Sequence, residues 1–341
     1  MRNRLLFVAG VSVGGCLWLG AMHSRGDRGE RPTFALTNPA ATPEAVGLMR
    51  YLAGVYGSRV LAGHQHSYRP DVADRELAAI REWTGKTPAI RGFDFMDAIN
   101  GRGGPHVERA LAWGRDRGGI VQLCWHWRLG GKPFFSDHRG HSRFPEGEPE
   151  DDPAINADLQ KVAAELKQFA EARVPVLWRP LHEPPGVWFW WHTGGPERYK
   201  RLWRHMHRVL VEEHGLNNLI WVYSTSDQGG PEAVEWYPGD DVVDVVGVDG
   251  YGGDWTRYWT GLTSLSGGRK MIAMTENGPI PPWDETSPWL WTMTWNNEIF
   301  AARTPDELRR HFNDRRTLTY DDLPTACDGN GRQARSWADI E

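Results

Sequence analysis

The chain has 341 residues, of which 40% are hydrophobic and 24% are charged. It is therefore long enough to bury a large core, and its length is common for a single α/β barrel. A net charge of −5 and the absence of a long cluster of lysine and arginine argue against nucleic acid as a partner. Nineteen tryptophans are more than a core accounts for, so we expect some of them to contact a flat, amphipathic ligand.

The N-terminal segment predicts export from the cytoplasm. The basic residues of MRNR precede an apolar run over residues 5–22 that has small residues near its end, which is typical of a signal peptide and borderline in length for a membrane anchor. Cys16 ends a weak lipobox-like pattern, although apolar residues continue past it. We expect residues 1–30 to be a signal peptide or anchor and residues 31–341 to form one domain outside the cytoplasm.

Short apolar runs alternate with amphipathic stretches along the rest of the chain. The runs predict eight strands at Val60–Gln65, Thr87–Phe95, Gly119–Trp127, Val174–Glu183, Asn218–Ser224, Val242–Tyr251, Lys270–Asn277 and Trp289–Asn297. The amphipathic stretches predict helices at Asp71–Thr84, Pro105–Arg117, Ala154–Ala172, Pro196–His214 and Thr304–Phe312. Because parallel strands need helical crossovers, eight strand–helix units predict a (β/α)8 TIM barrel.

Polar and aromatic residues gather where the predicted strands end. They are His64, Gln65 and His66 after the first strand, Asp94 and Asp97 after the second, Trp125, His126 and Trp127 after the third, His182 and Glu183 after the fourth, Asp249 and Tyr251 after the sixth, Glu276 after the seventh, and Trp295, Asn296 and Asn297 after the eighth. The chemistry of such barrels takes place at this end. The pattern therefore favours an active site over a buried polar network.

Two glutamates, Glu183 and Glu276, end the fourth and seventh strands on nearly opposite sides of the barrel mouth. Two carboxyl groups that face each other across a cleft can hydrolyse a glycosidic bond, because one protonates the departing oxygen while the other attacks the anomeric carbon or activates water. Trp125, Trp188 and Trp295 would offer ring faces to a sugar. A glycoside hydrolase that needs neither cofactor nor metal is the main hypothesis.

Two other classes remain open at this point. His64 and His66 on one strand resemble the metal site of amidohydrolases, which bind zinc through such a pair. That site also needs histidines after the fifth and sixth strands and an aspartate after the eighth, where the chain has Tyr223-Ser224 and Asn296-Asn297. The other class is a carbohydrate-binding barrel without catalysis, which has no use for two opposed glutamates.

The segment WRPLHE, which ends at Glu183 and is followed by WFWW at residues 188–191, resembles the acid/base segment of glycoside hydrolase family 26, the β-mannanase family. MTENG around Glu276 resembles its nucleophile segment, and LAGHQ, GFD, WH and Trp295 agree in order and spacing. The resemblance spans roughly residues 45–300. It implies a retaining endo-β-1,4-mannanase that acts on mannan or galactomannan by double displacement.

The resemblance also implies roles for individual residues. Glu183 would be the acid/base and Glu276 the nucleophile; the substrate-binding residues would be His126 near the scissile bond, His182 beside the acid/base, Trp188 under a leaving-group sugar, Tyr251 on the nucleophile and Trp295 as the floor of the cleavage subsite. The chain departs from the family pattern at Pro184-Pro185-Gly186-Val187, at Trp191-His192-Thr193 and at Asn296. The catalytic pair is intact.

The family also includes enzymes that act on mixed-linkage β-glucan and on β-1,3-xylan, so these substrates stay open beside mannan. The polar loop Ser136–Pro153 after the third strand is placed to wall off or extend the cleft, and such loops decide between internal and terminal cleavage. We expect a monomer whose partner is a polysaccharide, and a buried free thiol at Cys124.

Overall fold

The structure is a computed structural model that describes residues 34–67, 69–96, 104–135, 142–227, 233–301, 304–327, 333–334 and 336–340. All of them belong to one compact unit, Thr33–Glu341. The predicted export segment with Cys16, and Asp97 after the second strand, lie outside the described residues. In the ranges given above, none of the helices combines the length and apolarity needed to cross a membrane.

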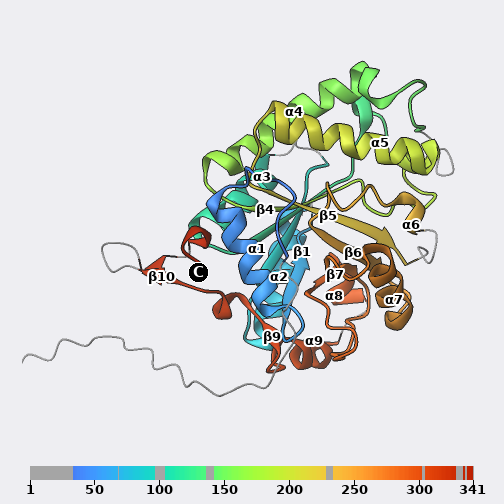
Figure 1. Ribbon diagram of the computed structural model, residues 1–341. Coiled ribbons are helices and arrows are strands. Elements are labelled where there is room, and N and C mark those ends of the chain that lie inside the picture. Colours follow the sequence, from blue (N-terminus) through green and yellow to red (C-terminus); the bar gives the residue numbers. More distant parts are fainter. Residues whose placement is uncertain are drawn as a thin grey trace, which may run out of the picture. The chain divides into compact units, whose positions relative to one another are not determined.

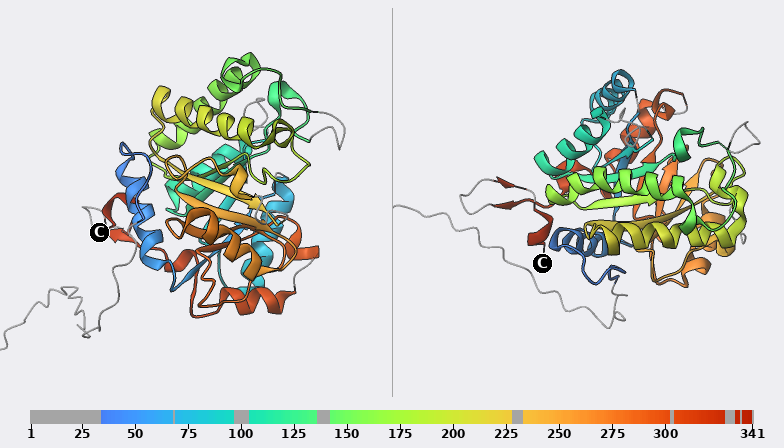
Figure 2. Two further views of the ribbon diagram at one scale, coloured as in Figure 1. Left: turned by 45° about the vertical axis from the view of Figure 1, so that its right-hand side comes forward. Right: turned by 90° about the horizontal axis from the view of Figure 1, so that it is seen from above.

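Parallel strands close into a barrel in chain order (Figures 1 and 2). They are β1 (Val60–Gln65), β2 (Ile90–Asp94), β3 (Ile120–Trp125), β4 (Val176–Pro180), β5 (Leu219–Ser226), β6 (Val245–Gly250), β7 (Met271–Asn277) and β8 (Trp291–Thr294). Strand β1 closes the ring because it pairs with β2 in the register Gly63↔Ile90 and with β8 in the register Leu61↔Trp291. The predicted (β/α)8 barrel is confirmed.

Helices cover the outside of the barrel (Figure 1). They are α1 (Pro43–Val55), α2 (Pro70–Thr84), α3 (Gly104–Leu111), α4 (Pro153–Glu171), α5 (Gly195–His207), α6 (Ala233–Trp236), α7 (Trp255–Ser266), α8 (Glu298–Ala301) and α9 (Pro305–Phe312). α3 and α5 each continue into a π-helical turn, at Ala112–Asp116 and Arg208–Glu213. Gly215, just after the second π-helical turn, has a φ of 64°, which is the left-handed conformation that glycine adopts most readily.

Four helices of the described residues, α1, α6, α7 and α8, are not predicted by the sequence patterns; α6 and α8 have only four residues each. Helix α1 has clear start signals, because the Thr42 side chain accepts a hydrogen bond from the Ala45 amide and Pro43 occupies the first turn. In α7 the Asp254 side chain caps the Arg257 amide, and Gly267 ends the helix with a φ of 56°. The predicted helices follow hydrophobic periodicity, whereas α1 and α7 are marked in the sequence by their capping residues.

Helix α1 and the C-terminal segment close the floor of the barrel. Apolar residues at the starts of the strands, such as Ile90 and Trp291, are buried in one cluster with Leu48 of α1 and with Trp337. The two segments touch closely, because a Cβ atom on Gly47 would lie 1.6 Å from the Trp337 carbonyl oxygen. The floor is therefore apolar and sealed, and the polar residues are left to the opposite end.

The barrel interior becomes polar toward the carboxyl ends of the strands. Gln65 and Gln122 are completely buried, and the Gln122 amide nitrogen lies 3.5 Å from the Thr275 carbonyl oxygen. Gly92 makes room for this layer, since a Cβ atom there would lie 2.0 Å from Gln65 Oε1. These residues form the layer under the carboxylates at the mouth.

Strand β4 ends earlier than the sequence predicts, at Pro180 rather than Glu183. Leu181 and Glu183 have φ values of 46° and 55°, which no strand accommodates. Left-handed residues other than glycine are strained and gather at functional sites. The turn is held by the Glu183 amide, which donates to the Ser224 carbonyl oxygen at 2.9 Å.

Candidate active site

The two predicted carboxylates meet at the barrel mouth. Glu183 follows β4 and Glu276 lies in β7, and one carboxylate oxygen of each lies within 4.8 Å of the other and of an oxygen of Asp249 in β6. All three carboxylates are at least nine-tenths buried. Three acids this close cannot all be charged without a compensating cation.

The cation is Arg179 of β4, which is completely buried beneath the pair. Its Nη1 atom donates to Asp249 Oδ2 at 2.7 Å and to Ser224 Oγ at 2.9 Å, and its Nη2 atom donates to Glu276 Oε1. Burial disfavours the guanidinium charge, but Asp249 and Glu276 outweigh this effect and raise the pKa of Arg179. One arginine thus serves two acids, and it is directed to Glu276 rather than to Glu183.

Glu276 is held from both sides. Its second oxygen, Oε2, accepts a hydrogen bond from the Tyr251 hydroxyl at 2.8 Å, and burial and the charge of Glu276 raise the pKa of Tyr251 well above its usual value, so the phenol stays a donor. Burial and the charge of Asp249 raise the pKa of Glu276 to about 7, while Arg179, His126 and Tyr251 act in the opposite direction. Glu276 has the bonds that stabilise a carboxylate.

Among the residues that the structure describes, no lysine or arginine bonds Glu183 in this way. Burial raises the pKa of its carboxyl group well above the usual value, and the charges of Asp249 and Glu276 add to the effect. Its Oε2 atom accepts a hydrogen bond from Trp188 Nε1. The two glutamates therefore differ in environment: Glu183 favours the protonated form and Glu276 is supported as the anion, which is the division that an acid and a nucleophile require.

The aromatic loop after Glu183 separates into one ring at the site and three that hold the loop. Trp190 Nε1 donates to the Trp127 carbonyl oxygen at 2.8 Å, and Trp191 Nε1 donates to the His182 carbonyl oxygen at 2.9 Å. Phe189 stacks on Trp191 with ring centroids 4.4 Å apart. Trp188 alone is half-buried and reaches the Glu183 carboxyl group.

The departures from the family pattern in this loop have a structural role. His192 Nδ1 lies 2.9 Å from the Pro184 carbonyl oxygen, and the His192 ring stacks on Trp236 of α6 with centroids 5.1 Å apart. At Gly186 a Cβ atom would lie 2.3 Å from the Trp188 ring. The residues PPGV and WHT therefore fix the path of the loop and the position of Trp188.

Histidines from two strand ends form the next part of the site. His126 and His182 pack edge to face with ring centroids 4.6 Å apart, and Trp295 lies 6.2 Å from His126. Burial, with the positive charges of Arg179 and His126, lowers the pKa of His182 well below its usual value, so His182 is neutral. Trp295 is half-buried, so part of its ring surface stays accessible at the end of the barrel where Glu183 and Glu276 lie.

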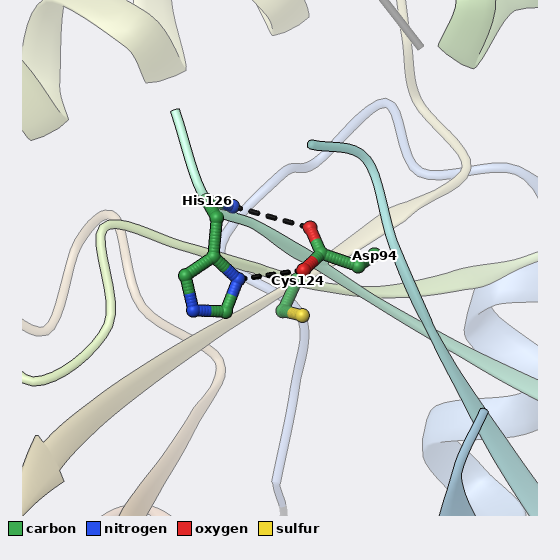
Figure 3. Close-up of side chains that lie close together, drawn as sticks. All are labelled: Asp94, Cys124 and His126. Carbon is green, nitrogen blue, oxygen red and sulfur yellow. Dashed lines mark hydrogen bonds and ion pairs between the residues drawn. The ribbon is translucent and has the colours of Figure 1, made fainter. Parts of the chain in front are cut away.

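Asp94 of β2 fixes His126. Its Oδ2 atom lies 2.6 Å from His126 Nδ1, and Oδ1 accepts the His126 amide at 3.2 Å and the Met96 amide at 2.9 Å. Figure 3 shows the two contacts between Asp94 and His126, with Cys124 of β3 next to them. Cys124 is a buried free thiol, as predicted.

The structure changes the interpretation of Trp125. The sequence predicts a sugar platform here, but the Trp125 side chain is completely buried, and it stacks on Trp127 with ring centroids 4.2 Å apart. Trp125 is the last residue of β3, and its ring also packs near Trp178 of β4. No ring face is accessible to a sugar, so Trp125 is a core residue that supports the strand ends.

The two histidines of the amidohydrolase-like pattern face the helix layer and bind different partners. His64 Nε2 lies 3.4 Å from Glu76 of α2, while His66 Nδ1 lies 2.7 Å from Arg91 Nη2. Burial and the charge of Arg91 lower the pKa of His66 to about 2. The two rings do not converge on one point, so the pattern does not form a paired metal site.

Two groups of side chains in the described part of the chain are close enough to hold a cation, namely Asp94, Cys124 and His126, and Glu183, Asp249 and Glu276. In the first group both Asp94 oxygens already accept hydrogen bonds, and burial with the charge of Asp94 raises the pKa of Cys124 well above that of an ordinary thiol. In the second group Arg179 already bonds two of the acids. Both donor sets favour acid–base chemistry over metal binding.

Sequence reasoning missed Arg179 and did not assign a role to Asp94 or Asp249. A signal for Arg179 is present, because an arginine in the apolar run VPVLWRPL must find buried acids. Sequence reasoning also missed Glu76 of α2. Its Oε1 atom accepts a hydrogen bond from the amide of Asn297, two residues after Trp295. No sequence signal places this helix residue against the end of β8. The part of the Ser136–Pro153 loop at residues 136–141 lies outside the described residues.

The family model described as Glycosyl hydrolase family 26 matches residues 37–322. A mannan endo-1,4-beta-mannosidase of Thermothelomyces thermophilus is 35% identical over 318 residues, which cover 85% of this chain and 63% of that protein. Endoglucanase H of Acetivibrio thermocellus is 29% identical over 204 residues, 53% of this chain and 20% of that protein.

A β-mannanase from a symbiotic protist of the termite Reticulitermes speratus, in complex with a gluco-manno-oligosaccharide, superposes with a TM-score of 0.77 at 29% identity and covers 87% of this chain and 99% of that one. The chain spans less than two thirds of the length of the Thermothelomyces relative and of two mannan endo-1,4-beta-mannosidases from Piromyces.

Proposed function

Because the chain belongs to glycosyl hydrolase family 26, we propose that it is a retaining endo-β-1,4-mannanase that hydrolyses mannan or galactomannan. The relatives named as mannan endo-1,4-beta-mannosidases support the substrate. The single observation that carries the chemistry is the pair Glu183 and Glu276, whose carboxylate oxygens lie within 4.8 Å. Retaining enzymes need carboxyl groups about 5–5.5 Å apart, whereas inverting enzymes leave a wider gap for water.

The proposed reaction has two displacements. In the first, Glu276 attacks the anomeric carbon while Glu183 gives its proton to the departing glycosidic oxygen, and a glycosyl-enzyme ester forms. In the second, Glu183 takes a proton from water, which attacks the same carbon and releases Glu276. The hydrogen bonds from Arg179 and Tyr251 hold the Glu276 oxygens in line and stabilise the carboxylate when it leaves.

The rings around the pair provide the proposed sugar contacts. Trp188, which bonds Glu183, stacks the leaving-group sugar, and Trp295 floors the cleavage subsite. His126 and His182 contact the sugar beside the scissile bond. The half-buried state of Trp188 and Trp295 supports these roles, since a stacking residue needs one exposed face.

The runner-up substrate is a mixed-linkage β-glucan. The similarity to an endoglucanase favours this alternative, and the structure in complex with a gluco-manno-oligosaccharide belongs to a relative that accepts both sugars in one ligand. A release assay for reducing sugar on mannan, galactomannan, lichenan and β-1,3-xylan separates the candidates. Activity on lichenan or β-1,3-xylan without activity on either mannan would contradict the proposed substrate.

The mechanism is tested with two alanine variants. Glu276→Ala should abolish turnover on every substrate, because no glycosyl-enzyme forms. Glu183→Ala should still be glycosylated by aryl β-mannosides with good leaving groups, and added azide should release the β-azide. Glu197→Ala, at an exposed glutamate paired with Lys200, is the matched control and should keep full activity. An α-configured azide from Glu183→Ala, or a β-azide from Glu276→Ala, would overturn the assignment.

We also propose that the enzyme acts as a monomer outside the cytoplasm, without a cofactor. The basic MRNR segment and the apolar run at residues 5–22 support export. Cell fractionation of the full chain, beside a variant with Cys16→Ala, distinguishes a cleaved or anchored chain from a lipidated one. Retention of the full chain in the cytoplasm would contradict export, and a dimer in size-exclusion chromatography would contradict the monomer.

A further inference from the structure

Asp94 and His126 form a hydrogen-bonded pair at the ends of adjacent strands, β2 and β3. The Asp94 carboxylate contacts both the ring and the main chain of His126, with Oδ2 2.6 Å from Nδ1 and Oδ1 3.2 Å from the amide nitrogen. The Met96 amide donates to the same Oδ1 at 2.9 Å. Three contacts fix the carboxylate plane, and with it the direction in which the imidazole points.

The His126 ring is also packed on its other sides. Phe134 and Phe189 contact it edge to face, with centroids 4.9 and 5.5 Å away, and His182 lies 4.6 Å away. In Figure 3 the Nε2 atom lies on the edge of the ring that is turned away from Asp94. His126 keeps 13% of its side chain exposed, so the ring lies at the surface of the cleft rather than inside the core.

We propose that Asp94 is a positioning residue that holds His126 as an imidazolium, so that its Nε2–H group donates to a hydroxyl of the sugar next to the scissile bond and its charge supports the anionic form of Glu276. This inference rests on the proposed function for the identity of the ligand. The inference specifies that both ring nitrogens of His126 carry a proton. Asp94 acts only through His126 and does not contact the substrate itself.

The charged groups that face His126 decide between its two protonation states. Asp94 and Glu276 favour the imidazolium, whereas Arg179 of β4 opposes it, as does burial; His182 is neutral and the Cys124 thiol is protonated. Burial alone would lower the pKa of His126, but the charge and hydrogen bond of Asp94 outweigh it, and the pKa is raised. The pair therefore stays charged until the pH rises through that raised pKa.

The substitution that tests the proposal is Asp94→Asn. The asparagine Oδ1 atom can still accept the His126 and Met96 amides, so the main-chain contacts survive, while the amide NH2 group faces Nδ1 and removes the acceptor that holds its proton. Nuclear magnetic resonance of the imidazole nitrogens in the intact enzyme should show both nitrogens protonated near neutral pH in the wild type. In the variant we expect a neutral ring with the proton on Nε2 only.

The kinetic readouts follow from the same change. Loss of the charge-assisted hydrogen bond should lower kcat/KM on mannan roughly 10- to 100-fold. Because the His126 charge lowers the pKa of Glu276, the acid limb of the kcat/KM profile should move to higher pH in Asp94→Asn. In a His126→Asn background the same substitution should have little further effect, since the residue through which Asp94 acts is gone.

Asp158→Asn is the matched control. Asp158 is also buried and accepts hydrogen bonds from Trp127 Nε1 at 3.0 Å and the Gly130 amide at 2.9 Å. Its replacement should therefore lower stability without changing the His126 protonation state or the acid limb of the kcat/KM profile. A His126 ring that is neutral in the wild type at pH 6 overturns the inference, even if Asp94→Asn fails to fold. If the wild-type enzyme is inactive on every β-glycan, the proposed function is refuted instead. The nuclear magnetic resonance measurement still reports the protonation state of His126 in that case.

Discussion

Replacing Arg179 with methionine should destabilise the barrel strongly, and the loss should depend on pH. The side chain is completely buried and bonds both Asp249 and Glu276. Removing one partner of a buried ion pair leaves an uncompensated charge and typically costs about 3–5 kcal/mol. Here two acids lose one cation, so we expect the upper part of that range, about 4–5 kcal/mol. At roughly 2 °C per kcal/mol for a large domain, the melting temperature should fall by about 8–10 °C.

The pH dependence follows from linkage. Asp249 and Glu276 already have raised pKa values, so the folded state binds more protons than the unfolded state between the ordinary carboxyl pKa of about 4 and the raised values. Stability then falls as the pH rises through this window. Without Arg179 both pKa values rise further. The deficit of Arg179→Met should therefore be smaller at pH 5 than at pH 8.

Thermal melts at both pH values, recorded for the variant and for a control, test this reasoning. Arg204→Met is the control, because Arg204 makes a bidentate pair with Asp241 that is largely exposed, and such surface pairs contribute about 0–1 kcal/mol. Adding Asp249→Asn to Arg179→Met should recover part of the stability, since it removes one unpaired acid. Equal losses at pH 5 and pH 8, or a loss no larger than that of Arg204→Met, would refute the buried-charge explanation.

Two further predictions concern the platforms and the absence of a metal requirement. Trp295→Ala should lower turnover strongly with little change in melting temperature, whereas Trp125→Ala should cost about 3–5 kcal/mol of stability, because Trp125 is completely buried. Thermal melts and the mannan assay, carried out on both variants, distinguish the two effects. A large loss of stability in Trp295→Ala would count against its role as a sugar platform. Prolonged dialysis against a strong chelator should leave activity unchanged, because Arg179 rather than a metal neutralises Glu276; a loss that zinc restores would argue for a metallohydrolase.

The barrel could be predicted from the sequence because hydrophobic periodicity is local information. Strands such as β1 and β7 lie within the apolar runs, at Val60–Gln65 and Met271–Asn277. The exact end of β4 could not be predicted, since the left-handed conformations of Leu181 and Glu183 are imposed by tertiary contacts such as the bond from the Glu183 amide to Ser224. Local propensity carries no information about such contacts.

For the site, the sequence identifies the residues at the strand ends but not how they pair or how exposed they are. Trp125 and Trp295 both look like platforms in the sequence, and only the packing of Trp125 on Trp127 separates them. The partners of Arg179 likewise cannot be read from the sequence, because they lie 45, 70 and 97 positions away along the chain. Contacts across the barrel interior depend on closure of the whole ring.

The sealed floor of the barrel has a practical consequence for where this domain ends. The family match stops at residue 322, yet Trp337 is buried against the face of α1 at Gly47, and the Ile340 carbonyl oxygen accepts a hydrogen bond from Arg50 at 2.6 Å. A chain cut at the edge of the sequence match would uncover apolar residues of α1 beneath the strands, although it would keep every residue of the cleft. Such a truncated protein should express poorly or aggregate, so an expression boundary should be taken from the packing around Trp337 rather than from the reach of the sequence similarity.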